Sequence, residues 1–552
     1  MSSIRRIREY VDSHGASYTL RRLFQMVSQR WFRTYERKRN RLASTPEELQ
    51  SQRDHQPDAG LISVVVPVYN TDPQMLKDLI ACLREQTYDR FEAVLYDGCS
   101  TREGTREVLQ ALEMENDRHF HIIRGKENKG ISGNTNEAVS FAQGEYVALC
   151  DHDDLLTPDA LWRVAQCIAE KAPDLVYSDE DKVTENGRCH IEPHYKPDFC
   201  PDDLNSNHYI SHLSVIRKSL YEEIGGLRSS MDGSQDHDLI LRVTEKTDRI
   251  CHLPYTLYSW REVRASMSHM DLQKCLETGC KAVMEHEANA GRRVIAKPVG
   301  KRIRLWYDIP EDVSVEAIIH GETSRACEDC FRELRSVTGW RNLSAGFAVA
   351  GNGAGLISEI DRIASESACE YLLLLDAGIS GIRPDLIREL LMYAQRDNVA
   401  GVSPILTDRK GRITHGGYAV GVDGIAQCVN EGLRASAGGW HDLMNKTHNV
   451  SAVSLGCMMV RKDIWLPLDE AYHGAFAMID LGLRQRRNGK WFVITPHATA
   501  VLEPSPLLLS SKKRGTKEIS ADMKLFEEKW GKKIYDPCYS SRFRRDKANC
   551  RF

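Results

Sequence analysis

The sequence lacks any long apolar run: its 552 residues contain no stretch of about 18 consecutive apolar side chains, the length that a membrane-spanning helix requires. The N-terminus also lacks the short apolar core of a secretory signal. We therefore expect a protein that stays in the cytoplasm and crosses no membrane. With 41% hydrophobic and 28% charged residues, the composition is that of an ordinary globular protein.

The sequence also lacks the usual patterns of a zinc site and of a glycine-rich phosphate-binding loop. Sixteen cysteines are scattered along the chain, and Cys327 and Cys330 form a C-x-x-C pair with no second pair nearby. This spacing disfavours zinc and indicates buried thiols in a reducing compartment. The segment PVYNTD (67–72), which closes the first apolar run, contains neither G-x-G-x-x-G nor a P-loop. A nucleotide bound here would need side chains and a metal to hold its phosphates.

Basic residues are concentrated at the N-terminus. The net charge of −4 disfavours nucleic acid as a partner, yet residues 1–42 hold eleven Lys/Arg against three acids. Apolar residues recur among these arginines at helical spacing: Leu20, Leu23, Phe24, Val27 and Trp31. This pattern predicts a basic amphipathic helix. Such a helix either lies in the interface of an anionic membrane or packs its apolar stripe on the protein, and we expect residues 43–60 to be a linker.

From Leu61 onward the pattern alternates between strands and helices. The segments ISVVVPV, FEAVLYD, HFHIIRG and EYVALC read as strands, with helical segments between them. Repeated βα units predict an α/β, Rossmann-like domain with a mostly parallel sheet, and such sheets bind ligands at the carboxyl ends of their strands. Polar clusters stand at three of these ends, over residues 69–72, 97–100 and 151–154.

The order of motifs repeats later in the chain. YVALCDHDDLLTPDAL (146–161) resembles YLLLLDAGISGIRPDLI (371–387), VIRKSL (215–220) resembles MVRKDI (459–464), and QDHDLILR (235–242) resembles AMIDLGLR (477–484). The repetition predicts a second domain of the same fold. We expect an N-terminal arm and linker over 1–60, a first domain over 61–305, a second over 306–510 and an extension over 511–552.

The second copy has lost particular carboxylates. Asp151 is kept as Asp376, whereas Gly378 replaces Asp153, Ile379 replaces Asp154 and Met478 replaces Asp236; Asp238 and Arg242 persist as Asp480 and Arg484. Residues 151–154 could cap the helix that follows Thr157 and Pro158. Both copies would need such a cap, so capping alone does not explain Asp153 and Asp236.

Carboxylates in this pattern suit a cation. Asp151 and Asp153 flank one residue on a loop and offer the oxygen ligands that Mg²⁺ or Mn²⁺ prefers. Asp236 precedes an apolar helical run, where it could face the same cleft as a general base. One alternative is a metal-dependent phosphohydrolase. Those enzymes carry D-x-D on their first strand with Thr or Val at the fourth position, whereas here it follows the fourth strand and Asp154 comes next.

Seven segments in order carry a family resemblance: SVVVPVYNTD, LYDGCS, NKGISGNTN, ALCDHDD, VYSDEDK, GSQDHDLILR and LYSWR. Together they resemble glycosyltransferase family 2 with the GT-A fold, in particular the long bacterial surface-polysaccharide members of rhamnosyltransferase or O-antigen type. The resemblance covers about residues 60–265 strongly and 310–540 more weakly. Two positions depart from the family pattern: the family usually has D-D-G-S where this chain reads Asp97-Gly98-Cys99-Ser100, so the second acid is lost at Gly98, and Gln235 stands where an acid commonly precedes the base.

The resemblance implies roles for individual residues. Pro67, Tyr69 and Asp97 would line the base and ribose pocket; Asp151 would contact ribose or metal, and Asp153 the metal; Asp236, next to Gln235, would be the catalytic base; Trp260 and Arg261 would contact the diphosphate or the acceptor; Asp179, Glu180 and Asp181 would contact sugar or acceptor. Simpler roles stay open: core packing for Trp260, a solvated turn for the acidic triplet 179–181, and ordinary hydrogen bonding for His152, His208, His212 and His252, which could instead be metal ligands.

These observations predict an inverting, metal-dependent glycosyltransferase that uses Mn²⁺ or Mg²⁺. It would move a sugar from a nucleotide-sugar donor, such as dTDP-rhamnose or a UDP-sugar, to a surface polysaccharide or lipid-linked glycan. The expected location is peripheral, at the inner face of the cytoplasmic membrane. The non-enzymatic alternative is a catalytically dead glycan-binding scaffold. The second domain is expected to be inactive, and either to brace the first or to bind acceptor glycan.

Overall fold

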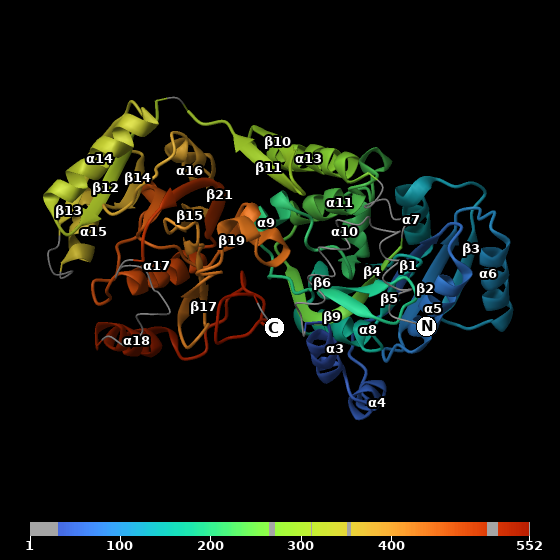
Figure 1. Ribbon diagram of the computed structural model, residues 1–552. Coiled ribbons are helices and arrows are strands. Elements are labelled where there is room, and N and C mark those ends of the chain that lie inside the picture. Colours follow the sequence, from blue (N-terminus) through green and yellow to red (C-terminus); the bar gives the residue numbers. More distant parts are fainter. Residues whose placement is uncertain (1–30, 264–270, 311, 350–354, 505–516, 551–552) are drawn as a thin grey trace, which may run out of the picture. The chain divides into compact units, whose positions relative to one another are not determined.

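The computed structural model describes residues 31–263, 271–310, 312–349, 355–504 and 517–550 (Figure 1). The chain divides into two compact units, the first made of Met1–Lys196 with Ile210–Ala282 and the second of Pro197–Tyr209 with Val283–Phe552. This division differs from the predicted one. Residues 197–209 belong to the second unit, the later boundary falls at 282 instead of 305, and the C-terminal residues 511–552 belong to the second unit.

Two helices precede the first sheet: α3 (Trp31–Leu42) and α4 (Pro46–Asp54). The predicted linker over 43–60 thus contains a helix, α4. The side chain of Thr45 accepts a hydrogen bond from the Glu48 backbone and the Glu48 carboxylate accepts one from the Thr45 backbone, a capping box that starts α4. Most of the predicted basic amphipathic helix lies outside the described residues. Among the described residues, no helix combines the length and the apolar character needed to span a bilayer.

The first unit begins with the predicted βα units: β1 (Ile62–Val68), α5 (Pro73–Arg84), β2 (Phe91–Asp97), α6 (Glu103–Glu115), β3 (Phe120–Arg124), α7 (Gly130–Phe141) and β4 (Tyr146–Leu149). Strands β3, β2, β1 and β4 lie in this order and run parallel. Every residue of β1 is buried, as its continuous apolar run predicts for a strand covered on both faces.

Antiparallel strands extend this sheet beyond β4. The elements are β5 (Leu155–Leu156), α8 (Ala160–Lys171), β6 (Leu175–Thr184), β7 (His190–His194), β8 (Ser214–Arg217), α10 (Lys218–Glu223), α11 (Gln235–Thr244), β9 (Ile250–Glu262) and α13 (Leu272–Asn289). Strand β8 runs antiparallel to β4 and β6, and β9 runs parallel to β6. The sheet order is β3-β2-β1-β4-β8-β6-β9-β5, with β7 beside β6.

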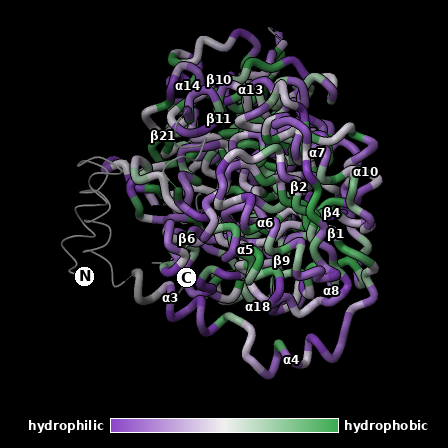
Figure 2. Tube along the Cα trace, turned by 90° about the vertical axis from the view of Figure 1, so that its right-hand side faces the viewer, coloured by the Kyte–Doolittle hydropathy of each residue, from purple (hydrophilic) through white to green (hydrophobic). Residues whose placement is uncertain are grey.

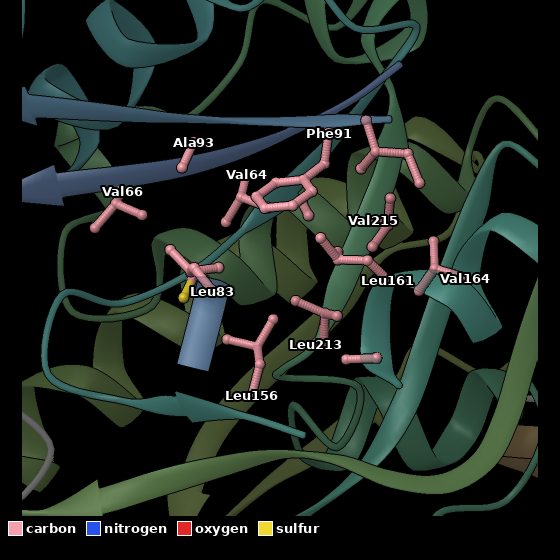
Figure 3. Close-up of a cluster of buried hydrophobic side chains, with 14 of the residues drawn as sticks. Val64, Val66, Leu83, Phe91, Ala93, Leu156, Leu161, Val164, Leu213 and Val215 are labelled. Atoms are coloured by element: carbon pink, nitrogen blue, oxygen red, sulfur yellow. The ribbon is translucent and has the colours of Figure 1, made fainter. Parts of the chain in front are cut away.

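Apolar side chains fix these strands against the helices. Val64 and Val66 of β1 belong to one buried cluster with Leu83 of α5 and Leu161 of α8 (Figure 3). In Figure 2 the chain is green along β1 and β4 and mainly purple along the polar helix α4. The buried sheet therefore holds the carboxyl ends of β1, β2 and β4 in fixed positions.

The second unit contains α9 (Pro201–Ser206), β10 (Val294–Val299), β11 (Arg302–Tyr307), β12 (Val315–Gly321), α14 (Ser324–Thr338), β13 (Leu343–Val349), α15 (Leu356–Glu366), β14 (Tyr371–Asp376), α16 (Leu386–Ala394), β15 (Val399–Thr407), β19 (His448–Val450), β20 (Cys457–Arg461), α17 (Ala475–Arg487), β21 (Trp491–Val501) and α18 (Lys517–Trp530). Its main sheet has the order β13-β12-β14-β20-β15-β21-β19. Cys327 and Cys330 are buried free thiols on α14.

This sheet repeats the plan of the first. Strand β12 runs parallel to β13 and β14, β20 runs antiparallel to β14 and β15, and β15 runs parallel to β21. The same relations hold for β1, β2, β4, β8, β6 and β9. The chain is thus a tandem of two α/β, Rossmann-like sheets, as the repeated motifs predict.

Candidate functional site

The first group of predicted site residues stands at the ends of β1 and β2, which lie side by side (Figure 1). Asp97 is buried; its Oδ1 accepts a hydrogen bond from the Ser100 backbone at 2.9 Å and its Oδ2 from Arg124 Nη1 at 3.1 Å. Pro67 is buried within β1, whereas the Tyr69 side chain just beyond it is 40% exposed. Tyr69 therefore offers an accessible aromatic face beside an ordered carboxylate.

A buried network shapes the loop after β4. Asp154 is fully buried: its Oδ2 accepts a hydrogen bond from Tyr258 Oη at 2.6 Å and its Oδ1 from the Arg261 backbone at 2.7 Å. The Tyr258 hydroxyl in turn accepts from the Asp151 backbone at 3.1 Å. Burial raises the pKa of Asp154, and the nearby carboxylates of Asp153 and Asp151 raise it further. Asp154 thus organises the loop, and its buried counterpart Ile379 keeps the position apolar.

Arg261 also stabilises the loop after β4, through hydrogen bonds of its buried side chain. Its side chain is 1% exposed and donates to the backbone oxygens of Asp153 at 2.6 Å and Glu185 at 2.9 Å, and to Asp78 Oδ2 at 3.1 Å. The guanidinium is enclosed and hydrogen-bonded within the protein, and the expected contact of Arg261 with the diphosphate or the acceptor stays a prediction. Trp260 packs on the hydrophobic cluster, as the core-packing alternative predicts.

We expect Arg261→Met to destabilise the first unit by about 3–5 kcal/mol, because the substitution strands buried acceptors. Arg249→Met is the matched control, since Arg249 pairs with Asp174 at 2.6 Å but is 57% exposed. Thermal unfolding measures both. Equal losses of stability in the two variants would contradict the positioning role of Arg261.

The residues predicted to bind the cation, Asp151 and Asp153, lie near the predicted base, Asp236. Asp151 and Asp153 have side chains that are 40% and 20% exposed. Asp236 lies in the first turn of α11 and is partly exposed. Burial raises the pKa of Asp236 to about 6; His212 opposes this shift, whereas the carboxylates of Asp151 and Asp232 add to it. Asp236, Asp151 and His212 are therefore near enough to act on one another's charge.

His212, one of the four histidines considered in the sequence as possible metal ligands, is a neighbour of Asp151. Its Nε2 lies 3.5 Å from Asp151 Oδ2, and its ring stacks on Tyr258 with centroids 4.8 Å apart. His252 is an ordinary hydrogen-bonded histidine, 3.0 Å from Asp179. The Gln235 side chain donates to Asp236 Oδ2 at 3.4 Å and accepts from the Gly233 backbone, which places it beside the base.

The acidic triplet 179–181 lies on β6 and is buried, so the solvated-turn reading is wrong. Asp179 accepts from His252 and the Lys196 backbone, Glu180 from His194 and the His212 backbone, and Asp181 from Tyr35, Arg39 and His190. Burial alone would raise the pKa of Glu180, but Lys196 and His194 bring that pKa well below its usual range. The three carboxylates thus have internal partners, and their expected contact with sugar or acceptor stays a prediction.

Within the described residues, no group of three or more His, Cys, Asp or Glu side chains is arranged to hold a metal by itself. Asp151 and Asp153 nevertheless supply hard oxygen donors on one partly open loop. Mg²⁺ is commonly held by one or two carboxylates together with substrate phosphates. The residues present fit an ion that arrives with a nucleotide, and His212, whose Nδ1 is buried without a hydrogen-bond partner among the described residues, adds one nitrogen nearby.

At the described positions of the second unit, the counterparts of Asp97, Asp153 and Asp236 are not acids, whereas Asp376 keeps the place of Asp151. In the sheet register Ile62 and Val315 are equivalent, so Val349 stands at the place of Asp97 and His320 at that of Pro67. Met478, the counterpart of Asp236, is fully buried on α17. The fold-holding pair persists: Asp238 bonds Arg242 at 2.7 Å, and Asp480 bonds Arg484 at 2.7 Å.

Comparison with known proteins agrees with this geometry. The carboxylates lie at the carboxyl ends of the sheet strands, which is where α/β sheets of this kind bind their ligands. Residues 63–225 match the family described as glycosyl transferase family 2. The chain therefore contains a glycosyltransferase family 2 domain, which runs from β1 to just past α10. Asp236 and Arg261 lie beyond the matched residues.

Individual proteins similar to this chain have 22–32% sequence identity with it. An uncharacterized protein, y4gI, of Sinorhizobium fredii is 32% identical over 86% of this chain and 57% of its own length. The O-antigen biosynthesis protein RfbC of Myxococcus xanthus is 28% identical over 79% of this chain and 36% of its own length. The chain thus spans between about a third and three fifths of these relatives. The S. aureus TarS 1–349 structure with UDP-GlcNAc has 22% identity, covers 41% of this chain and 66% of its own, and has a TM-score of 0.35.

Proposed function

We propose that the first unit is a metal-dependent, inverting glycosyltransferase that transfers a sugar from a nucleotide-sugar donor to a hydroxyl of a glycan. The observation that carries the proposal is the position of Asp236 in the first turn of α11, near enough to Asp151 and His212 for their charges to interact. Asp236 accepts the proton of the acceptor hydroxyl. The hydroxyl oxygen then bonds to the anomeric carbon as the bond from that carbon to the diphosphate breaks. The nucleoside diphosphate leaves with the electron pair, and attack from the opposite face inverts the configuration.

The remaining residues bind and position the donor. Tyr69 and Asp97 would line the base and ribose pocket together with Pro67, and Asp151 and Asp153 would hold Mn²⁺ or Mg²⁺ with the donor phosphates. Such an ion, when bound, neutralises charge on the leaving diphosphate. Arg261 acts by fixing the Asp153 backbone.

The pH dependence of transfer tests the base directly. Because Asp236 must be deprotonated and burial raises its pKa to about 6, kcat/KM should fall about tenfold per pH unit below about pH 6 and level off above it. The measurement is kcat/KM for the preferred donor between pH 4.5 and about 8. A profile that stays flat down to about pH 4.5 would argue against Asp236 as the base.

The substrates belong to surface-polysaccharide synthesis in this proposal. Support comes from the relative named for O-antigen biosynthesis and from the family match. The donor would be dTDP-rhamnose or a UDP-sugar, and the acceptor a polysaccharide or lipid-linked glycan. Release of the nucleoside diphosphate from a panel of sugar nucleotides identifies the donor.

The second candidate function, a glycan-binding scaffold without catalysis, suits the second unit. Val349, Gly378 and Met478 leave it without the acids that stand at these positions in the first unit. Its inactivity remains a prediction. We propose that this unit braces the first or binds acceptor glycan.

Peripheral contact with the inner face of the cytoplasmic membrane is a further part of the proposal, supported by the eleven Lys/Arg of residues 1–42. Deleting residues 1–42, which carry all eleven of these basic residues, should release the protein from anionic vesicles, because basic side chains bind anionic lipid electrostatically. Co-sedimentation with phosphatidylglycerol vesicles, with phosphatidylcholine vesicles as the control, measures this. Undiminished pelleting of the truncated protein would contradict the membrane contact.

A further inference from the structure

A buried ion pair in the first unit stands next to the site without belonging to it. Glu180 on β6 and Lys196 after β7 lie with Nζ 3.3 Å from Oε2, and their side chains are 10% and 0% exposed. Taking both charges out of water is costly, so a simpler core would use apolar residues here. Stability alone therefore does not explain why Glu180 and Lys196 are charged.

Both charged side chains form hydrogen bonds with the backbone of one short segment, residues 210–212. Lys196 Nζ donates to the backbone oxygens of Ile210 and His212, each at 2.6 Å. Glu180 Oε2 accepts from the His212 backbone N–H at 3.1 Å. His212 is thus held at both its N–H and its C=O by charged partners, and hydrogen bonds to charged groups are the stronger kind.

The segment carries His212 to the reaction site. The imidazole stacks on Tyr258 and brings Nε2 to 3.5 Å from Asp151 Oδ2. Tyr258 itself binds the Asp151 backbone and Asp154. Any shift of residues 210–212 would therefore move His212 away from Asp151, and the loop that presents Asp153 would lose one of its supports.

We propose that Glu180 and Lys196 are positioning residues for sugar transfer: together they clamp the backbone at residues 210–212 and so hold His212 beside Asp151 and Asp236. The inference rests on the proposed function for its consequence in catalysis. It also gives Glu180, the middle residue of the acidic triplet on β6, a positioning role.

The test uses the full chain with Lys196→Met, Glu180→Gln and the double variant. Each single variant leaves one buried charge without its partner, so we expect a lower thermal midpoint and a kcat reduced about 10- to 100-fold. Binding of the nucleoside without its phosphates should stay near the wild-type level, because Tyr69 and Asp97 are untouched. The double variant removes both charges, so its thermal midpoint should recover while kcat stays low.

A second readout does not depend on turnover. Amide hydrogen exchange of the peptide that covers His212 should become several-fold faster in Lys196→Met and in the double variant. Asp174→Asn is the matched control: Asp174 is also buried and bonds Arg217 and Arg249, but it does not touch residues 210–212. It should lose stability without a change in kcat or in exchange at His212.

The outcomes separate the clamp from the proposed function. Recovery of kcat together with the thermal midpoint in the double variant would overturn the clamp, as would unchanged exchange at His212 in Lys196→Met. A comparable loss of kcat in Asp174→Asn would overturn it as well. Absence of turnover in the wild-type protein would count against the transferase alone, since the exchange measurement still decides whether the pair holds His212.

Discussion

Replacing Asp236 with Asn should reduce sugar transfer by about a thousandfold, within the range expected when a general base is removed. Asn keeps the size and shape of the side chain but cannot take the acceptor proton. Nucleotide binding should stay near the wild-type level, because the expected base and ribose pocket lies at Tyr69 and Asp97. The measurement pairs kcat for the preferred donor with the Kd of the nucleoside diphosphate.

Asp238→Asn on the same helix separates chemistry from folding. The Asp238 carboxylate is buried and bound to Arg242 at 2.7 Å and to Arg228. We therefore expect this variant to lower the thermal midpoint without a comparable loss of kcat. A variant Asp236→Asn that keeps more than about a tenth of wild-type kcat would contradict the role of Asp236.

The second large effect is expected at Asp153. Burial raises the pKa of Asp153, the Asp151 carboxylate raises it further and His152 opposes both, so a cation bound here would relieve charge repulsion between the two acids. Asp153→Asn removes one oxygen anion from this pair. We expect the metal-dependent part of nucleotide binding to disappear and turnover to fall by at least about a hundredfold, since a metal supplies several kcal/mol of charge stabilisation.

Calorimetric titration with UDP or dTDP, with and without Mn²⁺, measures the effect of Asp153→Asn. Asp376→Asn provides the control, because Asp376 is the second unit's counterpart of Asp151 and its neighbour Gly378 offers no second carboxylate. This control should bind nucleotide and metal as the wild type does. Equal losses in both variants would place the cation elsewhere.

The sequence was most informative for features that can be predicted from a single strand or from comparing the two repeats. The βα pattern predicted the parallel strands β1 to β4, and comparing the two copies separated Asp153 and Asp236 from the structural pair Asp238 and Arg242. These inferences use short-range periodicity and strand-end position, which local sequence encodes well.

Contacts between distant residues were the part that local sequence did not predict. The triplet 179–181 reads as polar, yet Asp181 bonds Tyr35, which lies 146 residues earlier. Arg261 acts on Asp153 from 108 residues away. No spacing rule connects such pairs, so their burial and partners became visible only in the fold. Helix α4 is different, because its capping residues Thr45 and Glu48 form a T-x-x-E pattern, which is a local signal for the start of a helix.

The central claim, that the first unit transfers sugar with Asp236 as its base, is tested most directly by nucleotide release. Wild type, Asp236→Asn and Asp376→Asn would be incubated with a panel of sugar nucleotides and acceptor glycan, with and without Mn²⁺ or Mg²⁺. The account predicts metal-dependent release from one donor by wild type and by Asp376→Asn, and almost none by Asp236→Asn. Equal release by wild type and Asp236→Asn, or no release from any donor together with no metal-dependent nucleotide binding, would contradict it.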